Sequence, residues 1–414
     1  MNSTNSQDQN SRTGQRGTGH DAIVVGGGLI GLTIAWELNR RGLRPVVFER
    51  DLPGAATTSV AAGMLAPVGE LDFGEPDLLE LNLASARLYP DFVASVEEAG
   101  GLDAGHMECG ALHVALDRDE AGELRRISEL QRGYGLESTW LGPGATRDLE
   151  PGVSPSLAGS ILVEGDAVVD PRALVAALLP ALESAGVEVR SGSTVEELLR
   201  PDGQPWNPGQ EAAVGGVRLQ DGTDHFAPVV IAAPGADAGR AEWLPDEVRP
   251  PVRPVKGQVV ELRGSPGDPV ISRIVGSERV YLSPRRDGRI IIGATVEEMG
   301  FDARVTAGGV HELLREAYRL LPEIAELEFV TAISGFRPGT PDNLPVIGKT
   351  SIDGLILATG HYRNGILLAP VSASIVSDLV TGRPATGPGR AADPARFQPN
   401  ARSPRGPEGA PANE

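Results

Sequence analysis

The chain of 414 residues has a single cysteine, Cys109, so it can form neither an internal disulfide bond nor a paired-cysteine metal site. Its six histidines are scattered and none stands at a metal-ligand spacing, so we expect no bound metal. The sequence also lacks any apolar run near the ~18 residues of a membrane-spanning helix. Its polar N-terminus has no apolar core typical of a secretory signal. These absences favour a cytoplasmic protein with no membrane partner.

Positive charge is scarce as well. The chain has 37 Lys and Arg against 56 Asp and Glu, which gives a formal net charge of −19. A surface this acidic repels the phosphates of nucleic acids and of anionic lipids, so we expect neither as a partner. Aromatic residues make up only 4% of the chain, whereas glycine (53) and proline (34) are abundant. The composition is therefore typical of a loop-rich α/β protein.

Patterns of two kinds alternate along the chain. Short apolar runs indicate buried strands, and helical periodicity marks four longer stretches: 76–99, 120–133, 171–185 and 308–321. The basic run "RRDGR" (285–289) predicts a charged hairpin turn between two strands. Parallel βαβ pieces and antiparallel hairpins thus occur together. We predict an α/β fold in which a Rossmann-like, doubly wound domain is interleaved with an antiparallel-sheet substrate domain.

The two domains are expected to be discontinuous in sequence, because no Pro/Ser-rich linker separates them. We assign the cofactor-binding domain to 20–86, 152–247 and 335–385, and the substrate-binding domain to 87–151 and 248–334. The two ends, 1–19 and 386–414, are rich in polar, Gly and Pro residues and are expected to be disordered.

Residues 21–50 predict a strand, a helix and a second strand. Between the first two lies "GGGLIG" (26–31), which places Gly26, Gly28 and Gly31 at G-x-G-x-x-G spacing. In this motif the first glycine permits a tight turn, the second lets the backbone approach a pyrophosphate, and the third lets the helix pack close to the strand. The free N–H groups of the helix start suit phosphates. The pattern predicts a dinucleotide-binding site.

The identity of the dinucleotide is narrowed by the residues that follow. Glu49 ends the second strand, where it can accept hydrogen bonds from ribose hydroxyls and repel the 2′-phosphate of NADP, although neighbouring Arg50 weakens that exclusion. The small residues of "GAATTSVAAGMLAP" (54–67) permit close approach to a flat ring, but a flexible loop has the same composition. From these residues alone, FAD and NAD both stay open.

Five stretches together resemble the flavin-dependent D-amino acid oxidase family, and most closely its glycine oxidase branch. They are "DAIVVGGGLIGLTIAWEL", "TTSVAAGMLAP", "RVYLSPRRDGRIIIGAT", "GFRPGTPDNLPVIG" and "TGHYRNGILLAPVSASIVSDL". They occur in the family's order and span nearly the whole chain between its two ends. The resemblance implies FAD as the cofactor. It also implies non-covalent binding, because Cys109 lies far from the position where some sarcosine oxidases attach their flavin.

The resemblance further implies which residues contact FAD. The pyrophosphate, ribose and adenine would lie along Gly26, Gly28, Leu29, Ile30, Gly31, Glu49, Arg50 and Val195. The phosphates and flavin ring would lie along Thr57, Thr58, Ala62, Gly63 and Met64. The stretch His361, Tyr362, Arg363, Asn364, Gly365, Ile366 and Leu367 would pass under the flavin and begin the last helix, with its N–H groups facing the N1–C2=O edge. The family's aromatic residue within 229–239 is replaced here by Asp237.

Three further residues are implied at the substrate. Taken alone, Arg337 is more often a surface ion-pair partner and Tyr281 a half-buried strand residue. The resemblance implies instead that Arg337 clamps the substrate carboxylate with two hydrogen bonds, that Tyr281 adds a further contact, and that Arg363 lies at the same site. Arg279 and Val296 depart from the histidine and methionine found in the family.

The implied activity is oxidative deamination. Glycine, and also sarcosine or small D-amino acids, would be oxidised by FAD and dioxygen to the imine or 2-oxo acid, ammonia and hydrogen peroxide. The imine of glycine would supply thiazole synthesis, and the enzyme would be a homo-oligomer, a tetramer in the family. A D-amino acid dehydrogenase, a sarcosine oxidase-like enzyme and a non-catalytic FAD-binding protein are the alternatives. No acid–base group is required, so His113, His225 and Cys109 are expected to be structural.

Overall fold

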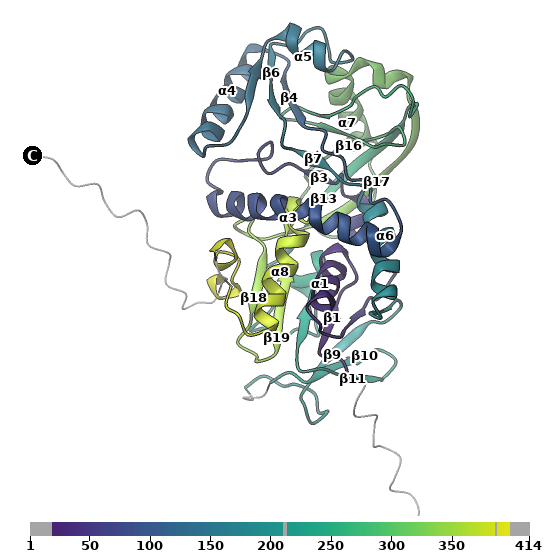
Figure 1. Ribbon diagram of the computed structural model, residues 1–414, viewed down its shortest axis with the longest axis vertical. Helices are drawn as coiled ribbons and strands as arrows, with labels where there is room; N and C mark the ends of the chain where they lie inside the picture. The colour runs from purple at the N-terminus through teal and green to yellow at the C-terminus, as the bar shows by residue number, and fades with distance from the viewer. Residues whose placement is uncertain (1–18, 210–212, 386, 398–414) are drawn as a thin grey trace, which may run out of the picture.

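Two large β-sheets organise the chain, one in each half of the molecule (Figure 1). The computed structural model describes residues 19–209, 213–385 and 387–397, so the segment 1–18 expected to be disordered lies outside the described residues. The lower sheet has six strands, five of them parallel, and the upper sheet has eight strands with mostly antiparallel pairing. The predicted α/β fold, with a doubly wound part and an antiparallel part, is confirmed.

The six-stranded sheet has the order β18-β19-β12-β1-β2-β8, with β18 antiparallel at one edge. Its strands are β1 (Ala22–Val25), β2 (Pro45–Phe48), β8 (Glu188–Arg190), β12 (Val230–Ala232), β18 (Val346–Lys349) and β19 (Leu355–Thr359). The central strands are buried on both faces, as expected of a parallel sheet with both faces covered. Alternate residues serve the two faces: Val24 belongs to the cluster under the helices and Ile23 to the cluster on the other side.

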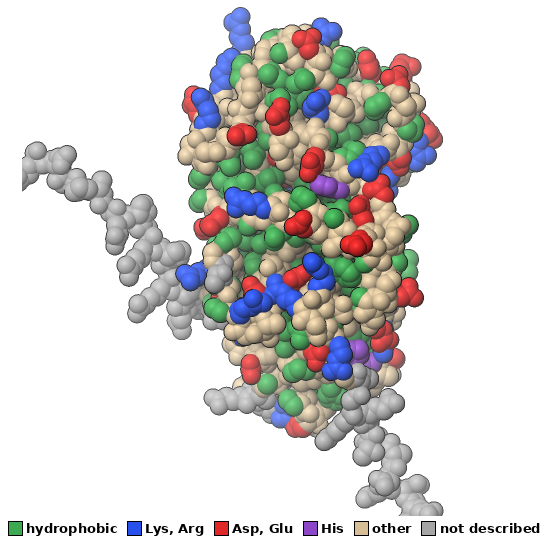
Figure 2. Space-filling model, viewed as in Figure 1, with side chains coloured by type: hydrophobic (Ala, Val, Ile, Leu, Met, Phe, Trp, Pro, Cys, Tyr) green, Lys and Arg blue, Asp and Glu red, His purple; other side chains and the backbone are tan. Residues whose placement is uncertain are grey.

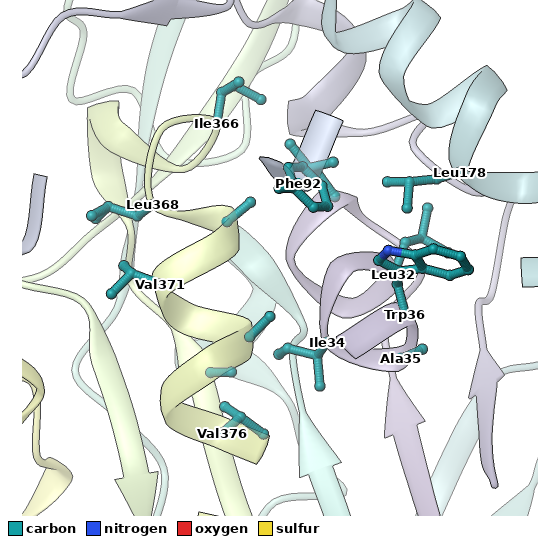
Figure 3. Close-up of a cluster of buried hydrophobic side chains, with 14 of the residues drawn as sticks. Leu32, Ile34, Ala35, Trp36, Phe92, Leu178, Ile366, Leu368, Val371 and Val376 are labelled. Carbon is teal, nitrogen blue, oxygen red and sulfur yellow. The ribbon is translucent and has the colours of Figure 1, made fainter. Parts of the chain in front are cut away.

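Three helices cover one face of this sheet: α1 (Leu29–Arg40), α6 (Pro171–Ser184) and α8 (Ala369–Val380). A fourth helix, α3 (Pro76–Gly100), packs on α6 and α8. Figure 3 shows how their apolar side chains meet, with Leu32 and Trp36 from α1 beside Leu178 from α6 and Phe92 from α3. The other face is covered by a three-stranded sheet of β9 (Val195–Leu199), β10 (Gly216–Leu219) and β11 (Asp224–Phe226). The helix layer thus supplies the main core of this half.

The eight-stranded sheet has the order β17-β13-β16-β15-β14-β4-β6-β5. Its strands are β4 (Ala111–Ala115), β5 (Thr139–Leu141), β6 (Gly159–Val163), β13 (Arg253–Arg263), β14 (Ile274–Gly276), β15 (Tyr281–Pro284), β16 (Arg289–Gly293) and β17 (Glu328–Gly339). The helices α4 (Arg118–Gly133), α5 (Pro143–Leu149) and α7 (Ala307–Leu320) lie beside it (Figure 1). All four predicted helices are confirmed, with ends that differ by two residues at most.

The hairpin predicted at 285–289 joins β15 to β16, but it is not simply a charged surface turn. Arg285 is 6% exposed and donates hydrogen bonds to backbone carbonyls and to Ser283, while Arg289 pairs with Asp170 at 2.6 Å. Two of the arginines therefore point into the protein, where carbonyl and carboxylate oxygens compensate their charge.

On the face shown in Figure 2, acidic and basic side chains are interspersed.

The tail expected to be disordered from 386 onward is packed over 387–397. Of two short turns, η4 (Gly387–Arg390) lies against α3 and η5 (Pro394–Phe397) lies against β18. Ala392 is fully buried and its carbonyl accepts from the N–H of Ile347 at 2.8 Å, while Arg396 pairs with Asp342 at 2.8 Å. These contacts outweigh the local Gly/Pro composition on which the expectation of disorder depended.

The division into domains stays a proposal, and the elements favour moving three of its boundaries. The boundary at 86/87 falls inside α3, whose buried residues on both sides share one core cluster. The boundary at 151/152 separates β6 from its sheet, and that at 334/335 cuts β17. We propose 19–100, 166–247 and 340–385 for the cofactor-binding domain, and 101–165 and 248–339 for the substrate-binding domain.

The helix layer gives a stability prediction. Leu32 is fully buried between α1 and its neighbours, so Leu32→Ala leaves a cavity and should cost about 2–5 kcal/mol. Leu102→Ala is the matched control, because Leu102 is 50% exposed and should lose under about 0.5 kcal/mol. Urea unfolding followed by circular dichroism measures both. Equal midpoints for the two variants would contradict the assignment of Leu32 to the core.

Candidate active site

The glycine turn between β1 and α1 contains glycines of two kinds. Gly26 has φ +114°, and a Cβ there would overlap the carbonyl of Ala233; a Cβ on Gly31 would overlap the carbonyl of Gly26. These two glycines are required by the chain itself. Gly28 has an ordinary φ of −71°, and the nearest atom to a Cβ there is Thr58 Oγ1 at 3.7 Å. Nothing in the chain demands a glycine at this position, which fits a ligand that approaches the backbone from outside.

Glu49 lies across this turn at the end of β2. Its Oε2 accepts a hydrogen bond from the N–H of Gly27 at 2.6 Å, which fixes the carboxylate beside the glycines. The N–H of Ser193 donates to the Glu49 carbonyl at 2.8 Å, so Val195 at the start of β9 also lies near this end of the sheet. The structure thus brings together the three parts of the expected nucleotide site: turn, acid and Val195.

The Arg50 side chain forms an ion pair with a carboxylate of the chain. Its Nη2 lies 2.6 Å from Asp237, the residue that replaces the family's aromatic, and Asp237 also pairs with Arg240. These ion pairs hold the η1 turn (Gly235–Arg240) against the end of β2. Arg50 therefore serves a contact between segments, and its charge is already balanced.

The segment 57–64 lies between the two halves of the molecule. It begins with the short helix α2 (Thr57–Val60), and the Thr57 hydroxyl donates to the carbonyl of Phe336 on β17 at 2.7 Å. The next residue faces the other way: Thr58 Oγ1 accepts from the N–H of Leu29 at the start of α1, at 3.2 Å. Adjacent threonines thus tie the segment to both sheets.

Residues 62–64 of this segment are held by hydrogen bonds, close packing and strand pairing. The Ala62 carbonyl accepts from Ser283 Oγ at 3.2 Å and from Arg285 Nη2 at 2.5 Å. Gly63 has φ +69°, and a Cβ there would overlap a carbonyl that follows β7 (Ala167–Val168). Met64 begins β3 (Met64–Leu65), which pairs with β7. The small residues of this segment are needed because it fits tightly between packed elements.

The stretch 361–367 does not begin the last helix, contrary to expectation. It forms a single 3₁₀ turn, η3 (Tyr362–Asn364), followed by irregular turns, and α8 starts only at Ala369. Tyr362 has φ +45°, a conformation that costs about 1–3 kcal/mol for a residue other than glycine and is found mostly at functional sites. The His361 ring is buried and lies 2.9 Å from Ser372 Oγ, and burial lowers its pKa to about 3, so it is neutral.

Two hydroxyls of α3 fix the orientation of this stretch. Ser85 donates to the Leu367 carbonyl at 2.6 Å, and Tyr89 donates to the Ile366 carbonyl at 3.2 Å. Within the described residues, the N–H groups of the buried Ile366 and Leu367 donate to no partner. Buried backbone donors are rarely left unpaired, so a ligand acceptor on this side is expected.

Two glycines on one face of the eight-stranded sheet make room for the expected substrate residues. A Cβ on Gly293 would overlap the Tyr281 hydroxyl, and a Cβ on Gly257 would overlap the Arg337 guanidinium. Arg337 donates to the carbonyl of Thr295 at 3.0 Å, while no Asp or Glu oxygen of the described residues lies within 4.0 Å of it. Its charge is therefore held in place without an ionic partner.

An acid that the sequence analysis missed faces these groups. Burial raises the pKa of the half-buried Glu70, and the charges of Arg363 and Arg337 oppose that rise. Burial likewise raises the pKa of Tyr281, with Arg337 again opposing. The four side chains therefore act on one another across a single site. Glu70 comes six residues after Met64 in "GMLAPVGE", and its place just beyond the small-residue segment could have singled it out.

The remaining candidates lie at the margin. Arg279 is exposed and Val296 is 62% exposed, so neither is enclosed by the site.

Among the described residues, no three His, Cys, Asp or Glu side chains are grouped to hold a metal ion. The same part of the chain has no helix both long and apolar enough to cross a membrane.

A doubly wound sheet with a glycine turn, joined to an antiparallel sheet, is the architecture expected of an FAD-dependent oxidoreductase. Comparison with family models bears this out: the FAD dependent oxidoreductase family, DAO, matches residues 21–379. The chain belongs to this family, and FAD is its cofactor.

Individual relatives are similar over most of the chain. The bifunctional protein ThiO/ThiG of Trichormus variabilis is 37% identical over 87% of this chain, which spans only about half (52%) of that relative. The glycine oxidase of Geobacillus kaustophilus is 36% identical over 87% of this chain and 93% of its own length. The crystal structure of glycine oxidase from the same organism superimposes with a TM-score of 0.82, covering 91% of this chain and 99% of that one.

Gly28 allows a direct test of the cofactor site. Gly28→Ala meets no steric obstacle within the chain, so the apoprotein should keep its melting temperature, while FAD affinity falls by at least about tenfold because the methyl group occupies ligand space. Gly122→Ala on α4 is the matched control, since a Cβ there also meets nothing within 4 Å. Fluorescence titration of apoprotein with FAD measures both variants. Unchanged affinity for Gly28→Ala would remove this turn from the site.

Proposed function

We propose that the protein is an FAD-dependent oxidase that deaminates glycine, with sarcosine and small D-amino acids as further substrates. One observation carries the proposal: the Arg337 guanidinium is fixed without an ionic partner beside the Tyr281 hydroxyl, while Glu70 faces the same site. A guanidinium for the carboxylate and a carboxyl group for the ammonium group are the two partners that an α-amino acid zwitterion requires.

Arg337 and Tyr281 would bind the substrate carboxylate. The planar guanidinium can donate two parallel hydrogen bonds to it, and its donation to the Thr295 carbonyl keeps the fork from rotating. Because burial raises the pKa of Tyr281, its hydroxyl stays protonated at neutral pH and can donate to the same carboxylate. Arg363, exposed at the start of the C-terminal stretch, adds positive charge at the mouth of the site.

The FAD would be held by the segments described above. The turn Gly26–Gly31 with Leu29 and Ile30, together with Glu49, would bind its pyrophosphate and ribose, and Val195 would lie at its adenine. Thr57, Thr58, Ala62, Gly63 and Met64 would line the phosphates and ring, and the N–H groups of Ile366 and Leu367, which follow Gly365, would face its pyrimidine edge. Arg50 would contribute only by holding Asp237. When bound, FAD supplies the two-electron oxidation of the substrate and passes the electrons to dioxygen.

The product and the assembly follow from the relatives. We propose that the imine of glycine supplies thiazole synthesis, which is supported by the likeness to the protein ThiO/ThiG, and that the enzyme works in the cytoplasm. The resemblance to the D-amino acid oxidase family supports a homo-oligomer, a tetramer in the first instance. Dioxygen as electron acceptor is supported by the likeness to a glycine oxidase over 93% of that enzyme's length.

Removing the guanidinium tests the carboxylate site. Arg337→Ala should raise KM for glycine about 100-fold or more, because the substrate carboxylate loses its charged partner, while the protein retains FAD. Arg337→Lys should recover only part of the loss, since an ammonium group cannot donate two parallel hydrogen bonds. The measurement is the rate of anaerobic flavin bleaching against glycine concentration.

Arg263→Ala is the matched control for that series. Arg263 is an exposed arginine on β13 of the same sheet, and its loss should leave KM unchanged. Wild-type KM in Arg337→Ala would exclude this arginine from substrate binding. Bleaching by glycine without rapid return of colour in air would instead favour a dehydrogenase.

A further inference from the structure

Two buried polar side chains converge on Gly69, the residue immediately before Glu70. A Cβ on Gly69 would overlap both Asp166 Oδ2 and His113 Nε2, so these two atoms occupy the space beside the glycine. Asp166 Oδ2 accepts a hydrogen bond from the Gly69 N–H at 3.0 Å. The turn that carries Glu70 is thus fixed from behind by an acid and an imidazole.

Both side chains keep one polar atom that no other described residue satisfies. Asp166 Oδ1 and His113 Nε2 are buried and have no hydrogen-bond partner among the described residues, and Asp166 is fully buried. An unsatisfied buried polar group costs about 1–3 kcal/mol, so two of them on one turn call for a functional explanation.

The pair is connected to the substrate site on both sides. On one side, the charge of Glu70 contributes to the raised pKa of Asp166. On the other side, a Cβ on Gly276 would lie 3.7 Å from His113 Nδ1 and 3.9 Å from the Cβ of Tyr281, so the imidazole is a neighbour of that tyrosine. Cys109 is the other titratable group that faces Asp166, while Arg337 and Arg363 face Glu70.

We propose that Glu70 removes the ammonium proton of the bound amino acid, and that Asp166 and His113 position Glu70 for this step. One N–H bond of the ammonium group breaks and one O–H bond forms on the Glu70 carboxylate, which leaves a neutral amine and a neutral acid. No electrons are transferred in this step. The half-buried carboxyl then returns the proton to solvent. The inference rests on the proposed function, because it requires an amino-acid substrate.

Such a base is useful because an amino acid carries a protonated amine at neutral pH, whereas its oxidation requires the amine lone pair. A carboxylate near Arg337 and Arg363 would on its own be a weak base, since both cations lower its pKa. Burial acts in the opposite direction. Asp166 contributes by staying uncharged, because burial raises its pKa to about 8, so it adds no negative charge beside Glu70 at neutral pH.

The pH dependence of flavin reduction tests the proposal. In Glu70→Gln the rate of anaerobic bleaching by glycine should fall about tenfold or more at pH 7 and recover toward wild type at high pH, where the free amine is already neutral in solution. Asp166→Asn and His113→Gln should show smaller losses of the bleaching rate at pH 7, with the same recovery at high pH. Glycolate, which has the carboxylate but no amine, should bind Glu70→Gln as tightly as wild type when its effect on the flavin spectrum is titrated.

Glu316→Gln is the matched control, because it removes another buried acid at a distance on α7 and should keep the wild-type profile. A wild-type pH profile in Glu70→Gln overturns the proposal. If that variant does not fold, Glu70→Asp keeps the charge and should retain the profile at a lower rate; a profile displaced to high pH in Glu70→Asp overturns it equally. Wild-type protein that glycine fails to bleach at any pH would instead refute the proposed function.

Stability gives a second test that does not depend on turnover. The pKa of Asp166 is raised from an ordinary value of 3.8 to about 8, so the folded state holds its proton more tightly than the unfolded state. Folding therefore loses stability as pH rises between these two values, and Asp166→Asn removes that loss. The melting temperature of Asp166→Asn relative to wild type should rise from pH 4 to pH 8. A constant difference would show that Asp166 is not held protonated.

Discussion

The site depends on one constraint: the segment from Thr57 to Glu70 must be held between the two sheets by hydrogen bonds from both. Thr58 meets the start of α1 on one side, while Ser283 and Arg285 meet the Ala62 carbonyl on the other. Asp166 then fixes the Gly69 end. Because the segment's backbone is held at each of these points, its small side chains can present a fixed surface to the cofactor.

Several of the charged side chains near this segment have the opposite sign to the net charge of the whole chain. The net charge is −19, yet Arg337, Arg363 and the buried Arg285 converge near the segment. Burial lowers the pKa of Arg285 to about 10, which still leaves it protonated at neutral pH. Arg285 is balanced by Asp170 at 3.8 Å and by carbonyl oxygens, whereas Arg337 donates to carbonyl oxygens and has no carboxylate partner among the described residues. The balanced arginine supports the structure, and the unbalanced one is available to a substrate.

Local patterns were sufficient where a residue's role is set by its neighbours in sequence. The glycine turn, the four helices and the hairpin all follow from short-range periodicity and turn chemistry. The start of α8 was misplaced because the carbonyl groups of Ile366 and Leu367 are held by Tyr89 and Ser85 of α3, which are distant in sequence. The packing of 387–397 likewise depends on β18 and not on its own composition.

The candidate site was predictable only in part for the same reason. Arg337, Tyr281 and Arg363 stand in stretches that resemble a known family, so they could be named. Glu70 is a single acid in a turn, and only its place just beyond the small-residue segment distinguishes it from the other acids of this chain. Asp166 and His113 gain their significance only when β4 and the end of β6 bring them to Gly69.

The groups proposed to bind the substrate are distributed over separate parts of the fold, and this has a physical consequence. Tyr281 and Arg337 stand on the eight-stranded sheet, Arg363 precedes α8 over the six-stranded sheet, and Glu70 lies on the segment between them. A bound amino acid that engages both Arg337 and Glu70 would therefore link elements of both halves of the molecule. Substrate binding across this junction would stabilise the relative position of the two sheets. The affinities for substrate and for cofactor should therefore increase together.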